Sequence, residues 1–362
     1  MIDLQQVLRI ITNNRSLLPV ITTSFTPYVP PWHLRNGLVQ TLATSYWYGQ
    51  TWQIWQERVW WLRGYDPIPW QAKIFSGAEN VPLWGLWACP PNARGTIILT
   101  YGVTGNIDRA WYSYLTAYKA YTQGWAVLLY DWRGHGKTAE LSPVPSSDGW
   151  REGSDLVYLA EQLVALGCPK KVVLVGFSLG GQIVFWGLKS AQGTSLIQAG
   201  VTLSPNLESN RSLHHLVSDP FGRLIERSLT KELIIEAQRR AEYFPEAVPS
   251  GAVERINSIR SFDLEMVIDY YGFSSVTEYY EQTAGLYLLD QLTLPYLVIY
   301  AADDPIFDPS LVTDLNNRMS SNSYGHLLLT DYGGHVSHIN QKNEVEDQFW
   351  GVNRILDFIN QI

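Results

Sequence analysis

The residues best suited to chemistry gather around Ser178, the third residue of the pentapeptide Gly-Phe-Ser-Leu-Gly at positions 176–180. The apolar run 171–175 precedes it and a helical pattern follows it, so the serine is predicted to lie in a tight turn between a strand and a helix. The two glycines let the strand and the helix approach closely, and the strained turn exposes the hydroxyl. By itself this pentapeptide can also be a packing device, but its flanking strand and helix favour a nucleophile elbow.

An acid and a base follow the serine in the chain order that such a nucleophile uses. A buried strand that begins at residue 296 leads into Asp303-Asp304, where a carboxylate can orient a histidine and stabilise its charge. Asp304 stands two residues before an apolar residue at the turn and is therefore our candidate acid, whereas we expect Asp303 to bond to the loop or to solvent. His335 follows two glycines after the last strand and is the candidate base. His338 is the weaker candidate.

Backbone amides are expected to complete this site. The apolar run 95–100 is followed by a Gly-rich loop. A loop after the strand that precedes the first helix supplies half of an oxyanion hole in folds with such an elbow. We assign the donors to the backbone N–H groups of Val103 and Leu179. In the expected reaction His335 takes the proton of Ser178, the serine attacks an ester carbonyl, and water resolves the acyl-enzyme. No metal or organic cofactor is expected.

Composition narrows the class of protein. The chain has 362 residues, 46% of them hydrophobic, and a net charge of −8 without a basic run, which argues against nucleic-acid binding. The two cysteines are too few for a disulfide framework or a zinc site, so a reducing cytosol is expected. The adjacent His214 and His215 lack a spaced carboxylate and are predicted to be loop residues, not metal ligands. No stretch reaches the roughly 18 apolar residues of a membrane span, which predicts a cytoplasmic protein, at most peripheral to a membrane.

Aromatic residues are the one anomaly in this composition. The chain has 15 Trp and 21 Tyr. A short N-terminal window contains six of the tryptophans: Trp47, Trp52, Trp55, Trp60, Trp61 and Trp70. An aromatic packing face explains this window most simply. Because Trp and Tyr also settle at lipid–water boundaries, peripheral membrane contact through the Trp-rich N-terminal region is the alternative.

Hydrophobic periodicity predicts four segments. Residues 1–70 read as a helical N-terminal extension, because apolar residues recur at helical spacing in 4–11 and again in 52–62. Residues 71–205 alternate strands and helices as the first part of an α/β core with a mostly parallel sheet. The alternation stops at 206–290, which reads as a helical cap. It resumes at 291–362, where strands are followed by a final helix expected over about 345–359.

Several strings resemble the YheT/ABHD1-ABHD3-like branch of the α/β-hydrolases. The resemblance spans roughly residues 25–360. It is carried by the segment 30–42 with its Leu-Arg-Asn and Gln-Thr-Leu, the elbow, the cap strings Ser261-Phe262-Asp263, Gly272-Phe273 and Tyr279-Tyr280, and by Asp303-Asp304-Pro305 and Gly-Gly-His. The Asp-x-Arg-Gly-x-Gly loop at 131–136 is common to α/β-hydrolases and precedes the nucleophile, so it is expected to be scaffolding. At Tyr101 this sequence departs from the family, which usually has histidine there.

The resemblance implies an α/β-hydrolase fold and a serine hydrolase of carboxylic esters. The family includes enzymes that act on esters and on phospholipids, so a lipid or a medium- to long-chain acyl ester is the implied substrate. Thioester hydrolysis and acyl transfer to an alcohol use the same triad and stay open. A non-catalytic module that binds a membrane or a partner is the alternative from another class.

Overall fold

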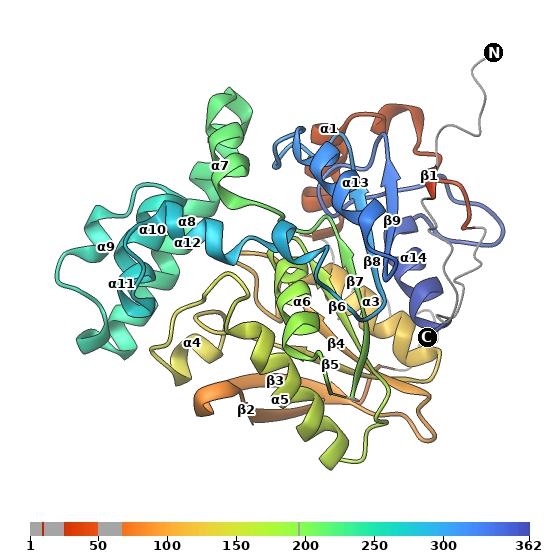
Figure 1. Cartoon of the computed structure of the whole chain (residues 1–362), viewed down its shortest axis with the longest axis horizontal. Coiled ribbons are helices and arrows are strands. Elements are labelled where there is room, and N and C mark those ends of the chain that lie inside the picture. Colours follow the sequence, from red (N-terminus) through yellow and green to blue (C-terminus); the bar gives the residue numbers. More distant parts are fainter. Residues whose placement is uncertain (1–8, 11–24, 50–66, 195) are drawn as a thin grey trace.

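The apolar runs of the sequence form one twisted sheet (Figure 1). We analysed a computed structural model that describes residues 9–10, 25–49, 67–194 and 196–362. Within these residues the strands are β1 (Arg9–Ile10), β2 (Gln71–Ser76), β3 (Pro82–Ala88), β4 (Gly95–Thr100), β5 (Trp125–Tyr130), β6 (Val172–Phe177), β7 (Ile197–Leu203), β8 (Tyr296–Ala301) and β9 (Gly325–Thr330). Their order in the sheet is β1-β9-β8-β7-β6-β4-β5-β3-β2. Strands β4 to β9 are mutually parallel, while β1, β2 and β3 pair antiparallel with their neighbours.

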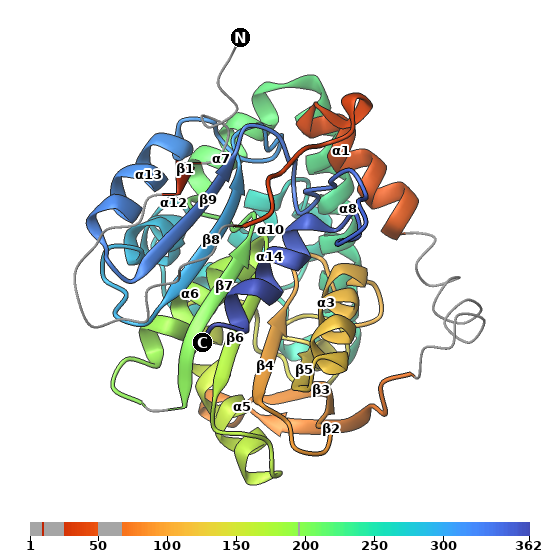
Figure 2. The same cartoon turned by 90° about the vertical axis from the view of Figure 1, so that its right-hand side faces the viewer.

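Helices cover both faces of this sheet. One face is covered by α5 (Glu152–Ala165) and α6 (Leu179–Ser190), and the opposite face by α3 (Trp111–Thr122) and α14 (Trp350–Ile359), as Figures 1 and 2 show together. Two more helices, α4 (Thr138–Leu141) and α13 (Leu311–Ser321), pack against β3 and β9 respectively. Every residue of β4, β5, β6 and β8 is buried, because helices lie on both sides. This double burial explains why those strands are continuous apolar runs.

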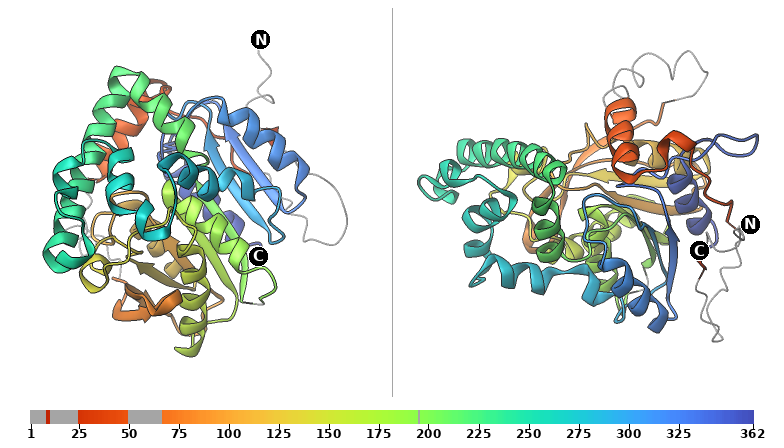
Figure 3. Two further views of the ribbon diagram at one scale, coloured as in Figure 1. Left: turned by 60° about the vertical axis from the view of Figure 1, so that its left-hand side comes forward. Right: turned by 90° about the horizontal axis from the view of Figure 1, so that it is seen from above.

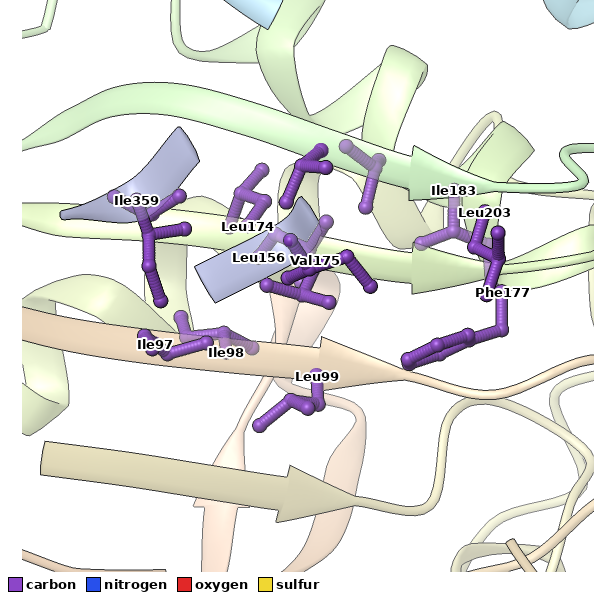
Figure 4. Packing of buried hydrophobic residues seen from close by; sticks show 14 of the residues in the cluster. Ile97, Ile98, Leu99, Leu156, Leu174, Val175, Phe177, Ile183, Leu203 and Ile359 are labelled. Atoms are coloured by element: carbon purple, nitrogen blue, oxygen red, sulfur yellow. The ribbon is translucent and has the colours of Figure 1, made fainter. Parts of the chain in front are cut away.

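Branched aliphatic side chains fill the space between the layers. Figure 4 shows Ile97, Ile98 and Leu99 of β4 beside Leu174 and Val175 of β6. Each is 1% exposed or less, so the parallel centre of the sheet holds a dry core. The carboxyl ends of the parallel strands emerge from this core at one edge, where the loops that carry the candidate site begin.

The segment between β7 and β8 is helical. It contains α7 (Ser209–Ser218), α8 (Pro220–Tyr243), α9 (Ala252–Arg255), α10 (Ile259–Met266), α11 (Ile268–Tyr271) and α12 (Val276–Thr283). These helices stand as a separate group beside the sheet (Figures 1 and 3). They bury a small apolar cluster of their own: Ala237, Ala252, Ile256, Met266, Val267, Ile268, Val276, Tyr279 and Tyr280. We call residues 206–290 the cap.

Local signals explain where several helices begin. The Asn36 side chain accepts a hydrogen bond from the Val39 amide at the start of α1 (Gly37–Ala43), which continues as a π-helical turn, Thr44–Gly49. Asp219 caps α8 in the same way, with Pro220 at its first position. Ser258 caps α10.

The predicted fold class, an α/β-hydrolase with a mostly parallel sheet, is confirmed. Three predictions of helix boundaries are wrong. Residues 9–10 form β1 instead of helix, because they pair with Leu328 and Leu329 at the sheet edge. Residues 345–349 precede the last helix, because the Asn343 side chain accepts two amides there and Phe349 bridges to Ile339. The helix expected through 263–271 breaks at Val267 into α10 and α11.

The helical pattern of 52–62, with Trp52, Trp55, Trp60 and Trp61, lies outside the described residues. None of the helices in the described part of the chain has the length and apolarity that crossing a bilayer needs.

Candidate active site

Ser178 occupies the turn between β6 and α6 with φ 54° and ψ −123°. Positive φ is strained for a residue with a side chain, and here it aims the hydroxyl away from the sheet. The glycines on either side are required by close backbone contacts. A Cβ on Gly176 would lie 2.3 Å from the Gly180 carbonyl oxygen, and a Cβ on Gly180 would lie 2.5 Å from the Thr100 carbonyl oxygen. The elbow therefore depends on both glycines.

The structure brings Ser178, His335 and Asp304 into one hydrogen-bonded chain. His335 Nε2 lies 2.9 Å from Ser178 Oγ, and His335 Nδ1 lies 2.8 Å from Asp304 Oδ2. With a proton on Nδ1, the imidazole donates to the carboxylate and accepts from the serine hydroxyl. The second oxygen of Asp304 accepts the Ile306 amide at 2.9 Å, so both oxygens of this buried carboxylate have partners.

The neighbouring carboxylate, Asp303, has a different role. Its Oδ1 accepts the Gly334 amide at 2.9 Å, which ties the β8 exit loop to the loop that carries His335. Its Oδ2 is buried without a hydrogen-bond partner among the described residues, and desolvation raises the pKa of this carboxyl. Asp303 thus bonds to the loop and does not contact the imidazole.

His338 lies in the core, away from the serine. Its ring stacks on Trp350 with centroids 5.8 Å apart, and Nε2 lies 3.2 Å from the Thr330 hydroxyl. Burial lowers the pKa of this imidazole to about 4, so it is neutral at pH 7. These contacts make His338 a packing residue.

Val103 and Leu179 line the same cavity as Ser178. Leu179 opens α6, where the first N–H groups of a helix have no partner within the helix. Val103 follows Gly102, whose own amide donates to the Tyr112 hydroxyl at 3.1 Å. A Cβ on Gly102 would lie 3.0 Å from the Cβ of Ser178, so glycine lets this loop approach the nucleophile.

The departure from the family at Tyr101 has a structural counterpart. The Tyr101 hydroxyl donates to Asp131 Oδ1 at 2.8 Å, and the Ile107 amide donates to the same oxygen. The other oxygen of Asp131 accepts the Lys137 amide at 2.9 Å. Tyrosine therefore braces the Gly-rich loop through a buried carboxylate, whose pKa burial raises to about 6.

The Asp-x-Arg-Gly-x-Gly loop scaffolds the neighbourhood of the site. Arg133 is fully buried and makes a two-pronged ion pair with Asp155, at 2.7 and 2.8 Å. His135 stacks on Trp132 with centroids 3.5 Å apart, and its Nε2 lies 3.8 Å from Glu236 Oε2 in the cap. Neither Arg133 nor His135 bonds to Ser178 in the hydrogen bonds of the described residues.

A cavity of about 570 Å³ opens above Ser178. Its walls come from α1, from the loops of the sheet and from the cap, and apolar side chains dominate them. The apolar lining includes Leu42, Val103, Trp111, Leu213, Leu216, Leu224, Ile225, Leu229, Leu233, Ile259, Phe262, Val267, Ile306, Phe307 and Val336. Such a space fits an extended apolar group whose carbonyl end reaches the serine.

Metal ligands do not cluster in the described part of the chain, where no group of three or more His, Cys, Asp or Glu side chains could hold an ion. His214 and His215, predicted to lie in a loop, instead belong to helix α7. Sequence reasoning missed one contact of the site. The Thr41 hydroxyl of α1 accepts the His335 amide at 2.8 Å. The only signal for it was the Gln-Thr-Leu string, which suggested no chemistry.

Residues 95–341 match the family described as alpha/beta hydrolase fold. The Synechocystis sp. protein named "Putative esterase slr0264" is 37% identical and covers 92% of this chain and 94% of its own. Human phospholipase ABHD3 is 21% identical, over 88% of this chain and 74% of its own. The solved Pyrococcus furiosus esterase Pf2001 shares the fold, with a TM-score of 0.54 and 19% identity over 81% of this chain and 91% of its own.

Proposed function

The chain belongs to the YheT/ABHD3-like branch of the α/β-hydrolase family and is a carboxylic ester hydrolase, and from this premise we propose that Ser178, His335 and Asp304 are its catalytic triad. The observation that carries the proposal is the unbroken chain of two hydrogen bonds through His335, at 2.9 and 2.8 Å. Both distances are within hydrogen-bond reach, as a nucleophile, its base and the orienting acid require.

The chemistry follows from these positions. His335 Nε2 removes the hydroxyl proton while Ser178 Oγ attacks the ester carbonyl, and the imidazolium is stabilised by Asp304. The negative charge on the carbonyl oxygen is held by the amides of Val103 and Leu179. His335 then protonates the leaving alcohol, and in the second half it activates a water molecule that releases the acid. In these steps the chain supplies the nucleophile, the base, the acid and the amide donors, and the ester and water are the reactants.

We also propose a lipid or a medium- to long-chain acyl ester as the substrate. The support is the apolar lining of the cavity, which continues from Val103 beside the serine to Leu229 and Phe262 of the cap. Each buried methylene of an acyl chain could contribute about 0.8 kcal/mol of binding. A relative named phospholipase agrees with such a substrate.

Peripheral contact with a membrane surface is part of the same proposal. Trp32, Tyr46 and Trp47, in the N-terminal region, are 81%, 64% and 75% exposed, and Phe221 and Leu224 of α8 are 58% and 59% exposed. Tyr46 and Leu224 also line the cavity. The exposed apolar side chains therefore continue into the cavity wall, which would let an acyl chain pass from a lipid surface towards Ser178.

Labelling with a serine-directed fluorophosphonate, followed by peptide mapping, tests the nucleophile. We expect one labelled site, Ser178, since an activated serine reacts with the probe and other hydroxyls do not. Folded protein that stays unlabelled beside a reactive reference hydrolase would contradict catalysis and favour a non-catalytic module that binds a membrane or a partner.

A series of p-nitrophenyl esters from two to sixteen carbons tests the substrate. We expect kcat/KM to rise from acetyl to medium or long chains, and to rise again when the ester is presented in vesicles. A steady fall after four carbons without a gain from vesicles would leave a small-ester hydrolase. Parallel assays with an acyl thioester, and with an alcohol as acceptor, separate thioester hydrolysis and acyl transfer from ester hydrolysis.

A further inference from the structure

Helix α1 packs against the two loops that carry the proposed acid and base. A Cβ on Gly37 would lie 1.8 Å from the Asp303 carbonyl oxygen. A Cβ on Gly334 would lie 2.5 Å from the Gly37 carbonyl oxygen and 2.6 Å from Thr41 Oγ1. Backbone therefore meets backbone on both sides of α1, with glycines at the points of contact.

The hydroxyl of Thr41 forms a polar contact between α1 and the loop that carries His335. It donates its single proton to the Gly37 carbonyl oxygen at 2.7 Å, which leaves its lone pairs to accept the His335 amide at 2.8 Å. Thr41 is 8% exposed, so water competes little for this bond. The acceptor thus holds the backbone of the residue whose imidazole contacts Ser178.

A second anchor from α1 comes from the residue adjacent to Thr41. The fully buried Gln40 accepts the Ile339 amide at 2.6 Å and the Tyr28 hydroxyl at 2.8 Å, and its own amide donates to the Leu34 carbonyl oxygen at 2.9 Å. Consecutive side chains of α1 therefore hold both ends of the segment 335–339.

The His335 loop needs such support because its own backbone is strained or permissive. Gly334 and Val336, on either side of His335, have φ of 58° and 52°. Glycine adopts this conformation freely, whereas a β-branched valine does so only when the surroundings hold it. Side-chain acceptors from outside the loop hold three consecutive amides: Asp303 Oδ1 accepts from Gly334, Thr41 Oγ1 from His335 and Ser204 Oγ from Val336. Of these acceptors, Thr41 holds the residue that carries the imidazole.

We propose that Thr41 is a positioning residue of the active site. Its hydroxyl fixes the His335 backbone so that the imidazole stays within hydrogen-bond distance of both the serine and the acid. The inference rests on the proposed triad and adds to it a residue that lies outside the matched segment 95–341. The N-terminal segment therefore contributes to the site, although the three residues of the proposed triad all come from the α/β core.

Thr41→Val tests the proposal, since valine keeps the shape of threonine and removes the hydroxyl. We expect kcat to fall by about 10²-fold with KM within about threefold, because a misplacement near 1 Å costs that much in rate. The rate of fluorophosphonate labelling at Ser178 should fall in parallel. Thr41→Ser keeps the acceptor and should recover most of kcat.

The matched control is Thr116→Val. Thr116 is buried in α3 and donates to the Tyr112 carbonyl oxygen at 2.7 Å, the same bond over one helical turn, but it does not contact the His335 loop or line the cavity. Loss of such a bond should lower the stability of both valine variants alike and leave kcat unchanged in the control. A similar loss of kcat in both, or in Thr41→Ser and Thr41→Val, would overturn the proposal.

Two further comparisons cover a Thr41→Val variant that does not fold and a failure of the proposed triad. Should Thr41→Val fail to fold, Thr41→Ser and Thr41→Ala replace it, since both remove the methyl group and only alanine removes the hydroxyl; equal kcat in this pair would overturn the proposal. Ser178→Ala separates the test of the triad from the test of Thr41. Turnover that survives in Ser178→Ala would refute the triad, whereas an inactive Ser178→Ala beside a fully active Thr41→Val would refute the role of Thr41 alone.

Discussion

The buried carboxyl of Asp304 differs in its surroundings from the buried carboxyls at the interface between the cap and the core. Both oxygens of Asp304, after β8, accept hydrogen bonds. Across the cap interface, Glu236 Oε2 has no hydrogen-bond partner among the described residues. Asp263 is bonded to the Tyr280 hydroxyl, and burial raises the pKa of this carboxyl to about 7. Burial also raises the pKa of Asp148, beneath the cap, well above its usual value.

The difference separates a carboxylate with a proposed role in the reaction from carboxyl groups that lie where the cap meets the core. Each oxygen of Asp304 has a hydrogen-bond partner, so its bonds can define the geometry of a reaction. Carboxyl groups under the cap favour the neutral form, so the free energy of cap docking should depend on pH. Substitutions of Ser178 and Asp304 are therefore expected to change turnover with little effect on stability, and substitutions at the cap interface the reverse.

The largest effect is expected for Ser178→Ala, which removes the nucleophile. Ester turnover should fall by roughly 10⁴-fold or more, while the free energy of unfolding stays close to that of the wild type. Steady-state kinetics and urea unfolding measure the two quantities. Retention of more than a tenth of the wild-type rate in a clean preparation would mean that another serine is the nucleophile.

The two histidines should separate next. His335→Ala should lower kcat by about 10⁴-fold, since the general base is lost. His338→Ala, which removes a ring stacked on Trp350, should lower stability by about 2 kcal/mol and change kcat far less. Assays on variants whose folding is checked by circular dichroism decide the assignment. A more severe loss of kcat in His338→Ala would reverse it.

The adjacent carboxylates offer a matched pair of the same kind. Asp304→Asn should lower kcat by about 10³- to 10⁴-fold, because the imidazole loses the acceptor that orients it and stabilises its charge. Asp303→Asn keeps an acceptor for the Gly334 amide and should cost less than tenfold. Steady-state kinetics on both variants measure the difference, and equal losses would show that this loop acts as a unit.

The smallest effect on turnover is expected at the cap interface. Burial raises the pKa of Glu236 to about 8, from an ordinary value of 4.5. The folded state therefore binds this proton more tightly than the unfolded state, and its contribution to stability is full below pH 4.5 and lost as pH rises to 8. Glu236→Gln should remove that decline with kcat nearly unchanged.

Urea unfolding between pH 5 and 8 measures this contribution. The stability of the wild type relative to Glu236→Gln should decrease with rising pH, by at most about 1.4 kcal/mol per pH unit. Glu232→Gln is the control, because Glu232 lies one turn earlier on α8 and its side chain is 40% exposed. An equal pH slope in the control would show that the effect is general to this helix.

Much of the fold could be predicted because the relevant signals are local. Residues 172–177 and 296–301 are continuous apolar runs, and strands buried on both faces need such runs whatever surrounds them. Ser178 could be singled out because a strained turn between strand and helix requires glycine at two fixed positions. The choice of Asp304 and His335 used chain order and strand ends, and their catalytic roles stay predictions that the variants above test.

Contacts between segments distant in sequence could not be predicted. Residues 9–10 have a helical pattern around them, but pairing with β9 satisfies their backbone at the sheet edge. The Thr41–His335 bond joins residues 294 positions apart, and nothing in a Gln-Thr-Leu string indicates which amide it will meet. The sequence by itself determined where strands β2 to β9 lie along the chain, the elbow and the candidate groups, because periodicity and turn chemistry act over a few residues. Only the tertiary structure decided which hydroxyl holds the histidine loop and which buried carboxyls lack partners, because these depend on how distant segments pack.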